Sequence, residues 1–345
     1  MRNAPPVRVF ATTDQRLPLR DVAAHAQRAE RLGYSGLQVP EAVHDGLLMA
    51  MRALEHTTSL GVTTSVLLAF PRSPMTTAIA AWDLAALSGG RFELGLGSQV
   101  RGNVEGRFGV AWTAPVPRLR EYVGALRAIW SCWQDGTPLD FAGAHYRFGR
   151  MQPFFNPGPI EQPAIPIALG AVGPLMTRLA GEVADALVTH PTNASPRVLR
   201  ERTLPKVAEG SQRTGRAAGA CAVVAGGFVA SGRDAAAVAA ERERIREYLG
   251  FLYSTPQYWP ALEVHGFAEV GRRLHELSRA GRWGEMRAEI GDDLLDALVP
   301  AAPYVEIADV LRAWFGDLCT GITFPVPADP ADDALAAAAI ARLRG

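Results

Sequence analysis

Short strand-like runs alternate with helical segments along almost the whole chain, and this alternation constrains the fold more than any other feature of the sequence. The strand-like runs cover residues 7–12, 36–41, 60–70, 92–97, 165–170, 185–190, 221–230 and 321–326. Most of the segments between them have the apolar spacing of amphipathic helices. Strands separated mainly by helices in this number fit a (β/α)8 barrel better than an open sheet. We therefore predict that residues 1–345 form a single TIM-barrel domain.

Two segments depart from the alternation and are predicted to be insertions in the barrel. Residues 134–164 are rich in Pro, Gly and aromatic residues, and the sequence FAGAHYRF within them predicts a small hairpin. Residues 233–316, before the last strand, have a predominantly helical pattern. Elsewhere, proline in the first turn and Gly89-Gly90 at the end predict a helix over residues 74–87. A long amphipathic helix is predicted over residues 118–133.

The charge balance and the hydropathy of the chain exclude several classes of function. The chain carries 35 basic and 35 acidic residues without a block of like charge, which argues against nucleic acid as a partner. No apolar run approaches the roughly 18 residues of a membrane span, and the N-terminus lacks the apolar stretch of a signal peptide. The three cysteines are scattered, so we expect neither a disulfide framework nor a metal site. We expect a cytoplasmic protein with a small-molecule substrate.

The segment FELGLGSQV, residues 92–100, carries a G-x-G at the end of a predicted strand. A dinucleotide-binding turn requires a third glycine where this chain has Val100, and it belongs in the first βα unit rather than after the fourth strand. Glycines that permit tight packing at a strand end are the simpler interpretation. In a barrel, however, the carboxyl ends of the strands form the active-site mouth, which would place Ser98 and Asn103 next to a ligand. Arg101 or Arg107 could then meet a phosphate.

Two further loops at predicted strand ends carry candidate functional residues. Gly170, Ala171, Val172 and Gly173 precede Pro174, the predicted first residue of a helix, so backbone N–H groups there could bind a phosphate. A plain βα turn explains the same residues equally well.

After the second strand, Glu41, His44 and Asp45 lie on one loop, and His44 could act as an acid or base with a neighbouring carboxylate. A merely packed or exposed histidine is at least as good an interpretation. Candidates for a substrate pocket are His190 at a strand end, Trp112 in a loop, and Tyr253 in the late helical region.

At the level of longer motifs, the chain resembles a known superfamily. Two motifs are similar to the bacterial luciferase-like flavin and deazaflavin oxidoreductases: SPMTTAIAAWDLAALSGGRFELGLGSQV and, after it, REYVGALRAIW. LSGGRFELGLG is the most specific local signature, and the likeness covers residues 7 to about 190. Two later motifs resemble the C-terminal part of the proteins in a branch associated with the deazaflavin coenzyme F420: HGFAEVGRRLHELSRAGRW and DDLLDAL. The resemblance implies a luciferase-like TIM barrel, a homodimer, and a cofactor bound noncovalently in the mouth.

The resemblance also assigns cofactor contacts to particular positions. Glu41 matches the acidic position next to the ring, and Thr64 and Ser65 match a bulge in the third strand that supports the ring, often through a non-prolyl cis peptide. The positions that match contacts to the phosphate or the cofactor side chain are Ser98, Asn103, Gly170, Ala171, Val172 and Gly173.

The chain departs from its relatives at several of these loops. Ala42 and Val100 replace a catalytic His and an active-site Glu of the sugar-phosphate dehydrogenases, which disfavours glucose-6-phosphate oxidation. Other departures from the closer branch are Gly46, Gly102, Asn103, Thr320 and Gly321. The leading hypothesis is an F420-dependent oxidoreductase that moves a hydride to or from a small organic substrate. The alternatives are an FMN-dependent luciferase-like monooxygenase and a barrel that binds a cofactor or ligand without turnover.

Overall fold

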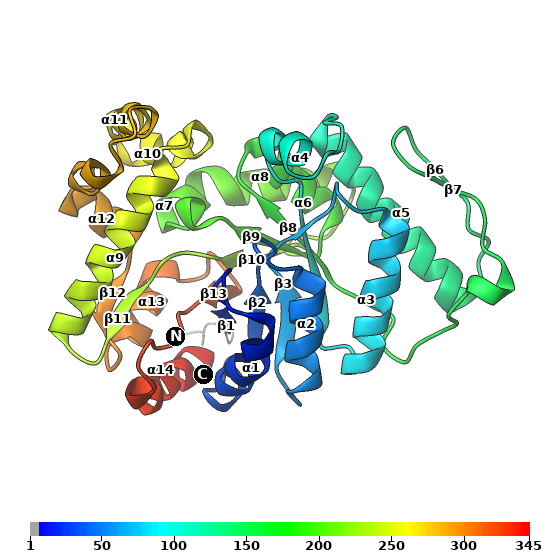
Figure 1. Cartoon of the computed structure of the whole chain (residues 1–345), viewed down its shortest axis with the longest axis horizontal. Coiled ribbons are helices and arrows are strands. Elements are labelled where there is room, and N and C mark those ends of the chain that lie inside the picture. Colours follow the sequence, from blue (N-terminus) through cyan, green and yellow to red (C-terminus); the bar gives the residue numbers. More distant parts are fainter. Residues whose placement is uncertain (1–6) are drawn as a thin grey trace.

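A closed barrel of parallel strands forms the centre of the molecule, as seen in a computed structural model that describes residues 7–345 (Figure 1). Within these residues the order of strands in the sheet is β3-β2-β1-β13-β10-β9-β8-β5-β4, and β3 also pairs with β5, which closes the ring. The barrel strands are β1 (Arg8–Thr12), β2 (Gly36–Val39), β3 (Gly61–Thr64), β4 (Leu67–Leu68), β5 (Phe92–Gly97), β8 (Ile167–Ala171), β9 (Ala186–Thr189), β10 (Ala222–Ala225) and β13 (Gly321–Thr323). The predicted TIM barrel is confirmed.

Helices surround the barrel and connect successive strands (Figure 1). They are α1 (Val22–Arg31), α2 (Gly46–Glu55), α3 (Pro74–Ser88), α4 (Arg101–Gly106), α5 (Pro115–Asp135), α6 (Pro174–Val183), α7 (Pro196–Val198), α8 (Leu204–Arg213), α9 (Ala235–Tyr253), α10 (Trp259–His265), α11 (Ala268–Arg279), α12 (Asp292–Leu298), α13 (Ile307–Phe315) and α14 (Asp333–Arg344).

Local capping explains where the predicted helices begin and end. The Ser73 hydroxyl accepts a hydrogen bond from the Met75 N–H at the start of α3, and Gly89 ends that helix with φ 62°. Helix α5 likewise begins at Pro115 and ends at Gly136, with φ 69°. It is therefore one turn longer than predicted at its N-terminus.

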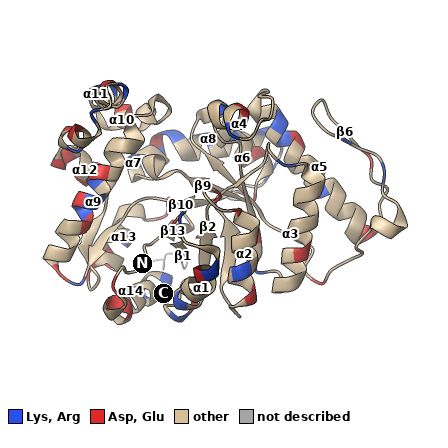
Figure 2. Cartoon of the chain, viewed as in Figure 1, with Lys and Arg blue, Asp and Glu red and all other residues tan. Residues whose placement is uncertain are grey.

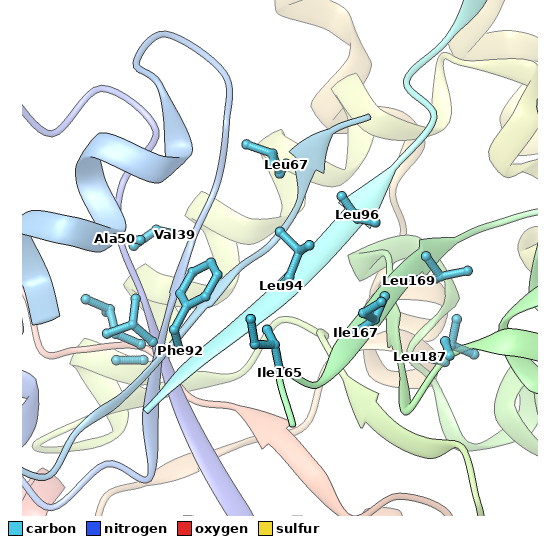
Figure 3. Close-up of a cluster of buried hydrophobic side chains, with 14 of the residues drawn as sticks. Val39, Ala50, Leu67, Phe92, Leu94, Leu96, Ile165, Ile167, Leu169 and Leu187 are labelled. Atoms are coloured by element: carbon cyan, nitrogen blue, oxygen red, sulfur yellow. The ribbon is translucent and has the colours of Figure 1, made fainter. Parts of the chain in front are cut away.

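The core lies between the barrel and its helices (Figure 3). Leu94, Leu96 and Leu169 are fully buried there, and Figure 3 shows them on adjacent strands β5 and β8. Inside the barrel, the Phe10 ring fills the space next to Gly36 and Gly321, where a Cβ would come within 3.0 Å of that ring. Burial of such side chains stabilises the fold by about 1.5–3 kcal/mol each.

Two predicted strands are interrupted. The first interruption is the bulge with a cis peptide that the resemblance implies, and it is confirmed; the second corrects the prediction of one continuous strand. The run 60–70 is divided into β3 and β4 by a bulge at Ser65–Val66, a peptide bond in the cis conformation. The run 221–230 is divided at Gly226-Gly227 into β10 and the start of β11 (Ala230–Gly232). Strand β11 leaves the barrel and pairs with β12 (Ala301–Pro303), so residues 233–316 are not wholly helical.

The first insertion forms the predicted hairpin, β6 (Phe141–Ala142) with β7 (Arg147–Phe148), on an arm that extends from the barrel (Figure 1). Acidic and basic residues are interspersed over the helices (Figure 2). Among the helices of residues 7–345, none combines the length and the apolar character needed to span a bilayer.

Candidate active site

A cavity of about 270 Å³ lies at the carboxyl ends of the barrel strands. It is lined by Thr12, Gln38, Ser65, Thr189 and Thr323 at the ends of β1, β2, β3, β9 and β13, and by residues of α9. A larger groove, of about 680 Å³, lies next to Pro166 and Asp185, which precede β8 and β9 at the opposite end of the barrel. TIM-barrel enzymes carry their active sites at the carboxyl ends of the strands, so the smaller cavity is the candidate site.

The G-x-G of residues 95–97 makes room for the bulge between β3 and β4. The Thr64 hydroxyl donates to the Gly95 carbonyl at 2.8 Å and accepts from the Gly95 N–H at 2.9 Å, so a side chain replaces ladder hydrogen bonds here. A Cβ at Gly95 would overlap with the Thr64 carbonyl, and one at Gly97 would overlap with Val66. These glycines serve backbone packing at the mouth and are not a dinucleotide turn.

Val66 also packs against the carboxyl end of β8. A Cβ at Gly170 would come within 2.9 Å of Val66 Cγ1, so the valine side chain fits between Gly97 and Gly170. Ser65, the residue before it, lines the cavity, and its N–H donates to the Val39 carbonyl at 2.7 Å. Three segments far apart in the sequence therefore meet at the bulge.

Glu41 holds the segment after the bulge in place. Its side chain is 8% exposed, and its carboxylate accepts from both terminal nitrogens of Arg72, at 2.9 and 2.5 Å, and from the Leu68 N–H at 2.7 Å. Asp45 accepts from Arg72 at 2.7 Å with one oxygen and caps α2 with the other. Burial works against the charge of Arg72, but the hydrogen bonds and charges of Glu41 and Asp45 outweigh it and raise the Arg72 pKa. Glu41 is thus paired with Arg72 rather than with His44.

The loop after β8 is suited to an anion. Gly173 is the N-cap of α6, a helix of 10 residues, and it has no side chain to accept from the first-turn N–H groups. Nothing lies within 4 Å of where its Cβ would be, so this helix N-terminus faces open space. Unpaired N–H groups and the helix dipole both favour a phosphate at such a position.

Ser98 and Asn103 follow β5 as predicted, but neither lines the cavity. The Ser98 hydroxyl donates to the Gln99 carbonyl at 3.3 Å, and Gln99 has a left-handed backbone with φ 58°. Asn103 lies in α4, and Arg107 of the same segment donates to the Ala42 carbonyl. The loop after β5 is thereby tied to the loop after β2.

His190 ends β9 and is linked to the loop after β8 by a chain of hydrogen bonds. Asn193 donates to the Val172 carbonyl at 3.2 Å, and the Thr192 hydroxyl donates to Asn193 Oδ1 at 3.0 Å. Thr192 Oγ1 also lies 2.8 Å from His190 Nδ1, and the Thr192 N–H donates to the same ring nitrogen at 3.4 Å. The His190 ring is stacked on Tyr258, with centroids 4.4 Å apart, and burial lowers the His190 pKa to about 4.

Of the predicted site residues, Ser65 is the one that lines the cavity; Tyr253, Trp112 and His44 are among those that lie outside its lining. Tyr253 is fully buried on the inner face of α9, and its hydroxyl donates to the Thr192 carbonyl at 3.0 Å, so it is a core residue and not a pocket residue. Trp112 packs edge-on against Phe70, with centroids 6.2 Å apart. His44 lies on its loop at intermediate exposure and does not line the cavity.

Sequence reasoning missed Gln38, Thr189 and Arg72, which the fold brings to the site. The sequence does carry a signal for Gln38, because it is a polar residue inside the otherwise apolar strand GLQV. Within residues 7–345, no group of three or more His, Cys, Asp or Glu side chains is arranged to hold a metal ion.

Comparisons with known proteins identify the family to which the chain belongs. The model of the luciferase-like monooxygenase family matches residues 5–320. An uncharacterized protein of Mycobacterium tuberculosis is 41% identical over 304 residues, which are 88% of each chain. A putative coenzyme F420-dependent oxidoreductase of the same species is 31% identical over 270 residues, 73% of this chain and 74% of that protein.

Among solved structures, the coenzyme F420-dependent tetrahydromethanopterin reductase of Methanopyrus kandleri has a TM-score of 0.81 at 18% identity and covers 98% of both chains. An F420-dependent secondary alcohol dehydrogenase, in complex with an F420-acetone adduct, has a TM-score of 0.73 at 19% identity. It covers 99% of this chain and 100% of its own. At these identities the two structures show the fold alone.

Proposed function

Because the chain belongs to the luciferase-like monooxygenase family, a family of oxidoreductases, we propose that it is an F420-dependent oxidoreductase acting on a small organic substrate. Bound F420 would supply or accept a hydride at its ring carbon. The observation that carries the proposal is the close approach of Val66, at the bulge, to Gly170 on β8, which would place a ring bound at the bulge next to a phosphate bound after β8.

The residues present fit such a cofactor. The open, uncapped N-terminus of α6 at Gly173 would hold the phosphate. Ser65 and Val66 would support the ring, while Glu41 and Arg72 fix the backbone that follows the bulge through Leu68. The chain of hydrogen bonds from Val172 to His190 would keep the phosphate loop and the end of β9 in register.

FMN is the competing cofactor. FMN is present in one solved structure with the same fold, the oxygenating constituent of 3,6-diketocamphane monooxygenase from Pseudomonas putida. This structure has a TM-score of 0.67 at 14% identity, and the match covers 98% of this chain and 97% of that chain. FMN also carries a phosphate, so the α6 N-terminus alone does not discriminate. The relatives named for coenzyme F420 favour the deazaflavin over FMN.

Titration of purified protein into F420 and into FMN, followed by quenching of cofactor fluorescence, tests the proposal. We expect tight quenching of F420 only; tight FMN binding with oxygen uptake would establish the monooxygenase instead. F420 binding without turnover on a broad substrate panel would favour a non-catalytic binding barrel.

Gly173→Asp places a carboxylate against the phosphate and should abolish F420 binding. Gly149→Asp, at a glycine of the arm that also has open space around it, is the matched control and should bind normally. Unchanged affinity in Gly173→Asp would remove this loop from the site.

We also propose that residues 1–345 form one domain and that the protein is cytoplasmic, as the sequence pattern indicates, and that it is a homodimer, as the sequence resemblance implies. Sedimentation velocity over a range of concentrations tests the dimer, and a monomer at all concentrations would refute it.

A further inference from the structure

Two buried polar side chains line the mouth cavity with hydrogen-bond donors that no protein group uses. The first is Gln38, on β2, which is only 4% exposed. Its Oε1 accepts from the Thr323 hydroxyl at 3.1 Å, and its Nε2 has no hydrogen-bond partner among residues 7–345. Nε2 is not among the fully solvent-excluded unpaired atoms of the described chain, so this nitrogen is accessible from the cavity that Gln38 lines.

The second is Thr189, at the end of β9, which is also 4% exposed. Its Oγ1 accepts from the Gly226 N–H at 3.0 Å. The hydroxyl hydrogen has no acceptor among the described residues and remains available to a ligand. An unpaired buried polar group costs about 1–3 kcal/mol, so a ligand acceptor that satisfied these donors would bind with that advantage.

The charges around the cavity do not compete for these donors. The ionisable residues in its lining are Glu241 and Arg244 of α9, which form an ion pair. Arg244 Nε donates to Glu241 Oε2 at 2.8 Å, and a terminal nitrogen of Arg244 donates to Glu241 Oε1 at 2.5 Å. The remaining wall includes the apolar side chains of Phe228, Val229 and Ile245. The cavity therefore has neutral donors, an apolar wall, and no carboxylate free to pair with a cation.

We propose that Gln38 Nε2 and Thr189 Oγ1 bind the oxygen of a small, neutral aldehyde or ketone, or of the corresponding alcohol. This inference rests on the proposed F420-dependent activity and names its substrate class. In the reducing direction, bound reduced F420 would supply the hydride and release a proton, becoming oxidised by two electrons. The carbonyl carbon takes the hydride, the C=O π bond opens, and the oxygen takes the proton from solvent to give the alcohol.

The donors suit this step because negative charge develops on the oxygen as the hydride arrives, and fixed neutral donors stabilise it. A cationic iminium carbon would find no anionic partner in the cavity. The volume of about 270 Å³ is at the lower limit of ligand pockets, and a ring bound at Ser65 would share it, so the substrate must be a small carbonyl compound.

The test uses cyclohexanone and reduced F420, with turnover measured as the return of F420 fluorescence. Gln38→Glu keeps the shape and removes the amide donors; Thr189→Val removes the hydroxyl and Thr189→Ser restores it. We expect kcat/KM to fall about 10²–10³-fold in Gln38→Glu and Thr189→Val, with recovery in Thr189→Ser. F420 affinity should stay within a few-fold of wild type in all three. Gln212→Glu, at an exposed position of α8, is the control.

A cofactor-free measurement separates the two proposals. Carbonyl-¹³C cyclohexanone is titrated with the protein alone, and its resonance should move downfield with wild type and not with Gln38→Glu. If F420 fails to bind but this shift occurs, the proposed function fails and the oxygen site stands. If F420 binds and the wild type reduces a cyclic iminium salt but not cyclohexanone, or if Gln38→Glu reduces cyclohexanone as well as the wild type does, the oxygen site is refuted.

Discussion

The fit of Val66 between two glycines leads to a prediction for Gly97→Ala. The added methyl group would lie well inside the separation of about 3.5–4.0 Å that two carbon atoms in contact keep. Val66 is β-branched and has little rotamer freedom, and the Gly170 backbone blocks its other side. The bulge must therefore shift, and overpacking of this kind costs about 1–3 kcal/mol.

Urea unfolding of wild type and Gly97→Ala measures this cost directly. Gly102→Ala is the control, because nothing lies within 4 Å of its Cβ and the substitution in helix α4 should stabilise by about 0.5–1 kcal/mol. The double variant Gly97→Ala with Val66→Ala should recover stability, with a coupling free energy of at least about 1 kcal/mol. Two outcomes would contradict this packing of Val66: the effects of the two substitutions on the free energy of unfolding are additive, or Gly97→Ala has the same free energy of unfolding as the wild type.

Three further predictions concern the surroundings of the site. Since burial lowers the His190 pKa to about 4 against an ordinary value of 6.5, the unfolded chain binds this proton first as the pH falls. Stability should therefore drop by about 3 kcal/mol between pH 6.5 and 4, and the drop should be smaller in His190→Gln when both are followed by urea unfolding. Glu41→Gln removes the charge opposite Arg72 and should cost about 1.5–3 kcal/mol in the same assay; a loss under 0.5 kcal/mol would contradict the role given to this pair. Gly210→Ala puts a methyl group onto the Arg178 carbonyl where α8 crosses α6, and should lower the melting temperature while Gly149→Ala does not.

The elements that could be predicted from sequence are those determined by local chemistry. Pro74 and Gly89 mark the limits of α3 because proline fits the first turn and glycine the left-handed cap, whatever the rest of the chain does. The run 221–230 was assigned wrongly because its apolar pattern is the same whether it joins one sheet or two. Its last residue, Ala230, begins β11, which pairs with residues 301–303, and no local signal identifies a partner so far along the chain.

The same limit applies to the site. Glu41 was predicted from its place after a strand, but Arg72 is 31 residues further on and only the closed barrel brings it to the carboxylate. Tyr253 was placed in the pocket by its aromatic character, whereas its position on α9 directs it into the core. Gln38 lies in a four-residue strand that is buried throughout, and its significance depends on Thr323 at the far end of the sequence.

The position of Val66 between Gly97 and Gly170 has a consequence for how this site can vary in evolution and in engineering. One volume is shared among three positions, so a larger residue at 97 or 170 is compatible with the barrel only when position 66 becomes smaller. These positions should co-vary among relatives as a set rather than in pairs. A designer who wants a wider cofactor seat should reduce residue 66 and leave both glycines unchanged.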